Sequence, residues 1–254
     1  MERVDVIAPG AGVALISLFD IDGHLLFDET AAFARLLVDS GAASVLVCGS
    51  SGEFWKLDDD ERAKLFGAVR AALPEGVPVI AHVGGVPLER AVELTHAAGA
   101  QGADAVIALP LGVDDLTVYY EGIIDVAGNL PVLAYHFPQA GAVVPIDELR
   151  GLGLAGLKDS SGDADRLVNE VLDLSIQTYT GSPALLGLSH DIDAAGALLG
   201  LANVHPDLCA SAFAGDRTAQ RKLAELSSES AQDFPQGLKR MVAQKWNISV
   251  NSRS

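Results

Sequence analysis

Eight short apolar segments recur along the chain, and a segment with helical spacing follows each of them. Each is bounded by glycine or proline and is almost continuously apolar, which is typical of parallel strands buried on both faces. Eight such units in 254 residues predict an α/β fold, the (β/α)8 TIM barrel. The expected strands are 12–19, 43–48, 77–83, 103–109, 131–135, 154–158, 176–179 and 197–202.

Three further helical patterns close the chain, near 207–212, 217–231 and 236–245. We therefore expect a barrel over 1–206 and additional C-terminal helices over 207–254 that pack on it. A doubly wound open sheet is the alternative. It more often has fewer strands, and no Gly-x-Gly-x-x-Gly motif follows the first strand here.

Charge and hydropathy narrow the range of partners. The net charge of −17 repels nucleic-acid phosphates. The stretch from Met1 to Ala8 lacks the apolar core of a signal peptide, and the apolar run 105–113, which contains Pro110, is too short to span a bilayer. Cys48 and Cys209 have no metal-ligand spacing. We expect a cytoplasmic protein with no nucleic-acid or membrane partner and no metal site.

A lysine ends the sixth expected strand, at the barrel face where catalytic residues gather. Alternate side chains of a strand share a face, so Lys158 should point with Ser160 and away from Asp159. Desolvation on an apolar strand lowers the pKa of an amine, as a nucleophile requires. The alternative is a strand-end lysine that reaches solvent. Other polar groups or turns at predicted strand ends are Ser17, Ser50, Ser51, Pro110, Tyr135, Gly181 and Asn203.

Four motifs follow one another at the expected strand ends. They read Gly49-Ser50-Ser51-Gly52-Glu53, Tyr135-His136-Phe137-Pro138, Lys158-Asp159-Ser160-Ser161-Gly162-Asp163 and Leu199-Gly200…Asn203-Val204-His205-Pro206. Together, and in register over roughly Gly12 to Pro206, they resemble the dihydrodipicolinate synthase/N-acetylneuraminate lyase family of class I aldolases. The matching family motifs are its Gly-Thr-Thr-Gly-Glu loop, its Tyr-Asn-x-Pro turn, its Lys-Asp-Ser-Ser-Gly-Asp segment and its Gly-Ala-x-Gly…Asn-x-x-Pro signature.

The resemblance implies that Lys158 forms a Schiff base with pyruvate or another 2-oxo acid, and that Tyr135 relays protons. It further implies a carboxylate cradle of Gly49, Ser50 and Ser51. The expected partners are a 2-oxo acid and an aldehyde. No cofactor is implied, and a homo-oligomer, dimer or tetramer, is expected from the family. His136 and Gly181 complete the candidate substrate-binding residues.

The chain also departs from the family pattern. The synthases have tyrosines after the fourth strand, where this chain has Leu111 and Gly112, and an arginine where it has Ala140. His136 replaces the usual asparagine, and the part after Pro206 is shorter than usual. Losing a phenol and a carboxylate-binding cation argues against lysine-pathway synthesis. N-acetylneuraminate lyases usually differ after the catalytic lysine, so sialic acid is not favoured either.

The expected function is therefore a class I lyase that cleaves or forms a C–C bond beside a 2-oxo acid, with pyruvate as one fragment. Three alternatives stay open. They are a Schiff-base dehydratase of a 2-keto-3-deoxy sugar acid, a 4-hydroxy-tetrahydrodipicolinate synthase, and a barrel that binds a 2-oxo acid without turnover.

Overall fold

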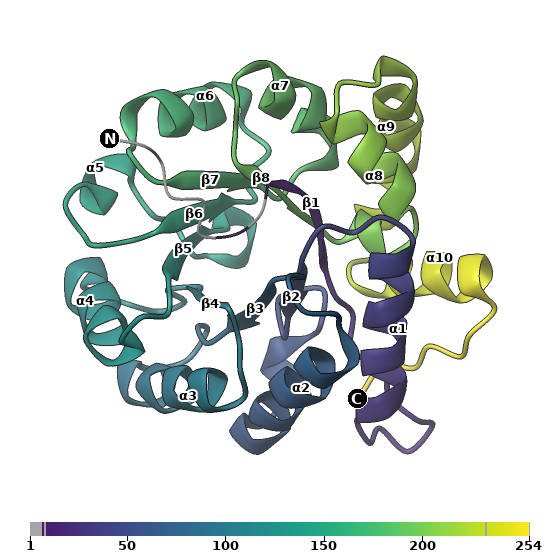
Figure 1. Ribbon diagram of the computed structural model, residues 1–254, viewed down its shortest axis with the longest axis horizontal. Coiled ribbons are helices and arrows are strands. Elements are labelled where there is room, and N and C mark those ends of the chain that lie inside the picture. The colour runs from purple at the N-terminus through teal and green to yellow at the C-terminus, as the bar shows by residue number, and fades with distance from the viewer. Residues whose placement is uncertain (1–6, 8, 232, 254) are drawn as a thin grey trace.

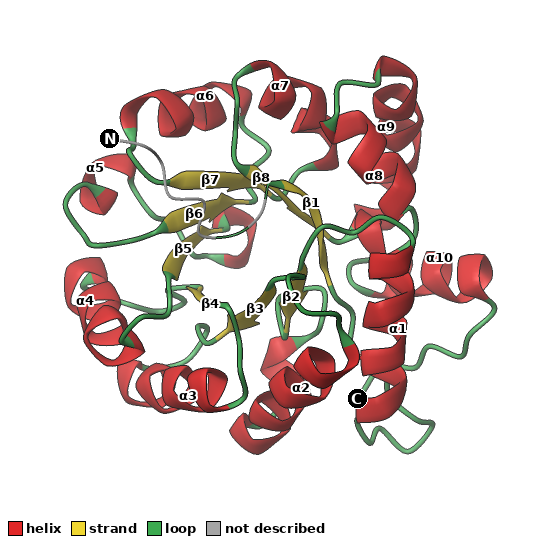
Figure 2. Cartoon of the chain, viewed as in Figure 1, coloured by secondary structure: helices red, strands yellow, loops and turns green. Residues whose placement is uncertain are grey.

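Eight parallel strands form a closed barrel in the order β1 to β8, and helices surround it (Figures 1 and 2). The computed structural model describes residues 7, 9–231 and 233–253, so most of the stretch from Met1 to Ala8 lies outside the described residues. The predicted TIM barrel is confirmed. The strands are Gly10–Ala14, Val45–Val47, Val79–His82, Ala105–Ala108, Val132–His136, Gly156–Asp159, Gln177–Thr180 and Gly196–Leu199.

The barrel closes where β1 pairs with β8, from Gly10 opposite Gly196 to Val13 opposite Leu199. The Asn203 side chain completes this seam, because it donates to the Ala14 carbonyl at 2.7 Å and accepts from the Ile16 amide at 3.0 Å. Both strands end earlier than predicted. The residues that follow them stay buried and apolar, so the apolar pattern continues after the strand geometry has stopped.

Helices α1 to α7 cover the outside of the barrel (Figure 2). Acidic N-caps fix several starts: Asp58 and Glu61 form a reciprocal capping box at α2, and Asp163 accepts from the Arg166 amide at α6. Between β7 and β8 the chain forms a 3-10 turn, Pro183–Leu185, followed by α7. The helix bounds are Phe27–Asp39, Asp59–Ala72, Leu88–Ala100, Leu116–Ala127, Ile146–Leu149, Ala164–Asp173 and Leu186–Asp191.

Three C-terminal helices follow: α8 (Pro206–Phe213), α9 (Arg217–Ala231) and α10 (Gln236–Trp246). In Figure 1, α10 lies beside α1 at one side of the barrel. Its last residue, Trp246, donates to the Asn203 carbonyl at 2.7 Å and packs edge-on against Phe33, so α10 is anchored close to the β1–β8 seam. No described helix is both long and apolar enough to cross a membrane.

Candidate active site

A cavity of about 170 Å³ lies at the carboxyl ends of the strands. Neighbouring strands β5 and β6 supply Tyr135 and Lys158, which are register partners in the sheet. Lys158 is the one charged side chain among the described lining residues, and most of the other polar groups there are hydroxyls. Ser50, Ser51, Ser160 and Gly181, all named from the sequence, line the same cavity.

The amine and the phenol contact each other directly. Lys158 Nζ donates to Tyr135 Oη at 3.0 Å, and the two side chains are 3% and 2% exposed. Lys158 and Ser160 face the cavity, while the Asp159 carboxylate accepts from the Ser161 amide and hydroxyl, so the predicted alternation is confirmed. Within the described part of the chain, no carboxylate oxygen comes within 4.0 Å of Lys158 Nζ. The amine therefore has a phenol as its neighbour in place of a counter-ion.

Tyr135 is the centre of a small hydroxyl network. Its Oη lies 3.4 Å from Ser50 Oγ and accepts from Ser160 Oγ at 3.5 Å. Burial raises the pKa of the phenol, but the charge of Lys158 and the hydrogen bonds from Lys158, Ser160 and Ser50 outweigh burial and bring the pKa below its usual value. A buried phenol that releases its proton more readily is suited to passing protons to and from a bound molecule.

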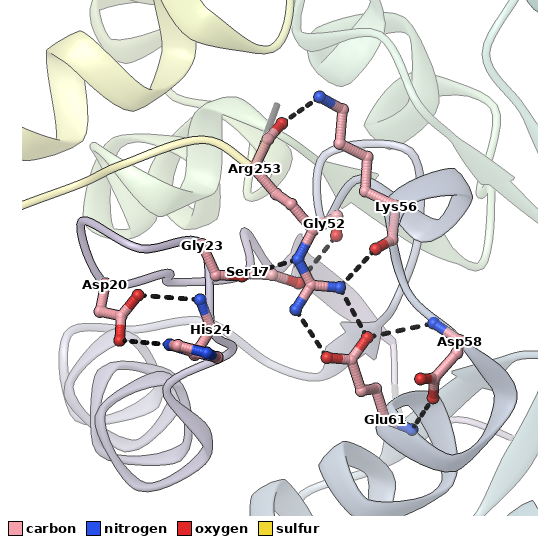
Figure 3. Close-up of polar contacts among 9 residues, drawn as sticks. All are labelled: Ser17, Asp20, Gly23, His24, Gly52, Lys56, Asp58, Glu61 and Arg253. Carbon is pink, nitrogen blue, oxygen red and sulfur yellow. Dashed lines mark hydrogen bonds and ion pairs between the residues drawn. The ribbon is translucent and has the colours of Figure 1, made fainter.

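The loop after β2 carries the two serines of the expected carboxylate cradle. Ser50 and Ser51 are buried and face the cavity, whereas Gly49 is not part of the lining. Gly52 holds the loop close to β1: its carbonyl accepts from Ser17 Oγ at 2.7 Å (Figure 3). A Cβ at Gly52 would lie 2.9 Å from the Leu15 carbonyl oxygen, so a side chain there would push the serines out of place.

A buried ion pair connects this loop to α10, outside the cavity. Glu53 adopts a left-handed backbone conformation, with φ of 54°, and its fully buried carboxylate binds Lys239 Nζ of α10. Lys239 also donates to the Asn251 carbonyl at 2.9 Å. Sequence reasoning missed Lys239, because its partner lies 186 residues away and nothing in the local pattern of α10 marks it.

The C-terminal segment makes a second set of polar contacts with the connection between β2 and α2. Arg253 binds both oxygens of the Glu61 carboxylate, at 2.6 and 2.7 Å, and donates to the carbonyls of Gly23 and Lys56 (Figure 3). Lys56 Nζ in turn donates to the Arg253 carbonyl. The segment after α10 is therefore fixed to the β2–α2 connection, which contains the cradle.

Two other predicted site residues have different surroundings. Gly181 lines the cavity, where a Cβ would lie 2.1 Å from Ser160 Oγ, so glycine leaves that hydroxyl its place beside Tyr135. His136 alternates with Tyr135 along β5 and is not among the cavity residues. Its Nδ1 accepts from the Val144 amide at 2.9 Å, and burial together with the charge of Arg166 lowers its pKa to about 4. The geometry gives His136 a part in the turn after β5.

One group of described side chains has the spacing that a metal ion needs: the ligand atoms of Asp20, Asp22 and His24 lie within 4.8 Å of one another. These residues belong to the turn between β1 and α1, outside the cavity. The Asp20 carboxylate already accepts from the amide of Asp22. It also accepts from the amide of His24 and contacts His24 Nδ1 at 3.0 Å (Figure 3). These bonds give the cluster a structural role in closing the turn.

Tyr119 and Tyr120 lie in α4, as expected of packing residues. Both are buried, and Tyr120 Oη donates to the Ala108 carbonyl at 3.1 Å. Burial raises the pKa of Tyr119 well above its usual value. Neither lines the cavity that contains Lys158, so they do not replace the phenol that the synthases carry after the fourth strand.

Comparison with known proteins agrees with this geometry. Residues 9–246 match the profile of the Dihydrodipicolinate synthetase family. A DapA-like lyase of uncharacterized function from Halobacterium salinarum is 32% identical over 253 residues, which cover 92% of this chain and 83% of the relative. A putative dihydrodipicolinate synthetase from Pseudomonas aeruginosa shares the fold at a TM-score of 0.87 and 22% identity, covering 97% of this chain and 92% of the other. YagE from E. coli K12, solved in complex with pyruvate, gives a TM-score of 0.84 at 22% identity and covers 92% and 87%. This chain belongs to the dihydrodipicolinate synthetase family.

Proposed function

We propose that this protein is a class I lyase in which Lys158 forms a Schiff base with a 2-oxo acid, and that pyruvate is one of the two fragments. The observation that carries the proposal is the buried contact between Lys158 Nζ and Tyr135 Oη, 3.0 Å long, inside a cavity that is also lined by serine hydroxyls. Membership of a family of lyases and the pyruvate bound to YagE support it.

The chemistry begins when the unprotonated amine attacks the ketone carbon of the 2-oxo acid. The carbinolamine that results loses its hydroxyl as water after taking a proton, which Tyr135 is placed to supply. The product is an iminium, which withdraws electrons from the neighbouring carbon. The serine hydroxyls of the loop after β2 hold the carboxylate during these steps and orient the ketone toward the amine.

In the cleavage direction, the substrate is a 4-hydroxy-2-oxo acid. Its 4-hydroxyl gives up a proton, the C3–C4 bond breaks, and the bonding electrons move into the iminium to form an enamine. The aldehyde leaves, the enamine takes a proton at C3, and water releases pyruvate from Lys158. Tyr135 and the hydroxyls around it are the groups close enough to Lys158 to carry these protons.

Reductive trapping tests this proposal. Borohydride added in the presence of pyruvate should leave one reduced adduct, which peptide mass spectrometry places on Lys158. Lys158→Met should give none. A lyase should then release pyruvate from 4-hydroxy-2-oxo acids, whereas a dehydratase would release water and keep the carbon chain intact. No adduct with pyruvate or any of a panel of 2-oxo acids would favour a barrel that binds without turnover.

A further inference from the structure

A second cavity, of about 330 Å³, adjoins the catalytic one and shares Ser50, Phe137 and Phe234 with it. We refer to it as the apolar pocket. Its large side chains are apolar, and no described lining residue is charged. Six side chains make up most of its wall: Phe54, Trp55, Leu109, Leu111, Phe137 and Phe234.

The two cavities differ in chemistry although they are neighbours. The catalytic cavity has an amine, a phenol and serine hydroxyls, whereas Ser50 and Gln139 are the polar side chains in the described wall of the apolar pocket. The side-chain amide of Gln139 already donates to the Ser161 carbonyl at 3.0 Å. Phe137 stands between the two cavities, with its ring parallel to that of Tyr135 at 5.9 Å. For a molecule bound covalently to Lys158, the apolar pocket therefore lies on the far side of the Phe137 ring.

We propose that the apolar pocket holds the aldehyde-derived part of the substrate, and that this part is an aromatic or branched aliphatic group. The proposal rests on the lyase function given above and specifies its substrate class. The substrate would then be a 4-hydroxy-2-oxo acid whose C4 substituent is apolar, and cleavage would give pyruvate and an apolar aldehyde.

The size of the pocket fits this occupant. An apolar cavity of roughly 150 Å³ accepts benzene, and the apolar pocket is about twice that volume. Trp55, Leu111 and Phe234 are 52%, 40% and 42% exposed, so three large apolar side chains meet solvent at one small site. A ring bound among them would remove apolar area from water on both surfaces.

The same wall disfavours other aldehydes. A polyhydroxylated chain would lose bound water there and find few hydrogen-bond partners in return. An aldehyde with a second carboxylate would lie next to Leu111 and Ala140, with no cation among the described residues of the wall to bind it. Leu111 and Ala140 therefore act as specificity-determining residues in this proposal.

The test compares two substrates that differ at C4: 4-hydroxy-2-oxo-4-phenylbutanoate and 4,5-dihydroxy-2-oxopentanoate. Pyruvate release should give the wild type a kcat/KM ratio of about 10 to 100 in favour of the phenyl compound, from the apolar area that the ring buries. Leu111→Glu and Trp55→Ala should each lower this ratio about tenfold or more. The matched control is Leu172→Glu, on the outer face of α6 where Leu172 is 74% exposed, and it should leave the ratio unchanged.

Three results would overturn the proposal. One is a wild-type ratio of one or less, and another is a ratio that neither pocket variant alters. The third is a change of oligomeric state on size-exclusion chromatography in Leu111→Glu with the ratio intact, which would assign the pocket to a second copy of the chain. Pyruvate trapping on Lys158 separates the two levels of inference. An adduct with an unfavourable ratio refutes the apolar substrate alone, and absence of the adduct refutes the lyase function as well.

Discussion

Two lysines are buried in this molecule, and their partners differ. Lys158 and Lys239 are each 3% exposed. Lys239 binds the Glu53 carboxylate and the Asn251 carbonyl, so its charge is neutralised by a fixed counter-charge. Lys158 meets the Tyr135 phenol, which can give or take a proton. Burial alone therefore does not distinguish the two amines, and the neighbour that can exchange a proton is what favours Lys158 as the nucleophile of the proposed reaction.

The different partners also give the two lysines different roles, one in holding the structure together and one inside the cavity. Burial lowers the pKa of Lys239, and the hydrogen bond and charge of Glu53 oppose that effect. This pair joins α10 to the loop that carries Ser50 and Ser51, so it supports the site without touching the cavity. The Lys158–Tyr135 pair lies inside the cavity, where the proposed function requires proton exchange with a bound molecule.

The largest expected effect is a difference in the free energy of unfolding between two single variants, in which each lysine is replaced by methionine. Lys239→Met leaves the buried Glu53 carboxylate without its partner and should lower the free energy of unfolding by about 3–5 kcal/mol. Lys158→Met leaves no opposite charge unpaired and should change the free energy of unfolding by no more than about 1 kcal/mol. Urea denaturation of the two variants gives both values.

The double variant Lys239→Met/Glu53→Leu is the control for the ion pair. Removing both charges should recover most of the loss, since no buried ion remains. If Lys239→Met were as stable as Lys158→Met, the proposed contrast between a structural and a reactive lysine would be wrong.

The next effect concerns the phenol. Tyr135→Phe removes the proton-carrying group and should lower kcat about a hundredfold, while a pyruvate adduct on Lys158 still forms, more slowly. Steady-state pyruvate release and borohydride trapping measure the two quantities. Tyr119→Phe is the matched control, because that phenol is also buried but lies outside the cavity. Equal rates in the two variants would exclude Tyr135 from proton transfer.

The local pattern of the sequence predicted the barrel and most of the cavity, since both depend on short-range order. Strand alternation correctly separated Lys158 and Ser160 from Asp159, and the apolar runs identified all eight strands. The same alternation would have placed His136 on the outer face if β5 had been taken one residue further.

What the sequence did not reveal depends on contacts between distant segments. Lys239 and Arg253 reach residues 186 and 192 positions away, and neither end of these pairs has a distinctive neighbourhood in the sequence. The apolar pocket likewise combines side chains that follow β2, β4 and β5 with Phe234. Such groupings appear only once the barrel has brought the strand ends together.

The smallest effect extends the comparison to His136, another of the buried basic groups, for which no acidic partner lies within 4.0 Å among the described residues. Burial, then the charge of Arg166, lowers its pKa to about 4 from 6.5. The unfolded chain therefore binds a proton at His136 between pH 6.5 and pH 4 while the folded chain does not. The folded state consequently keeps its full stability above pH 6.5 and loses part of it as the pH falls toward 4.

His136→Asn keeps an acceptor for the Val144 amide but removes the titration. The stability of the wild type relative to this variant should fall by about 2.5 kcal/mol across that window. Urea denaturation of both proteins at several pH values measures this difference, and carboxylates that titrate alike in both cancel from it. A difference that stayed constant with pH would mean that folding leaves the pKa of His136 unchanged, and a difference that grew as the pH fell would mean that an acidic group pairs with it; either result would contradict the prediction.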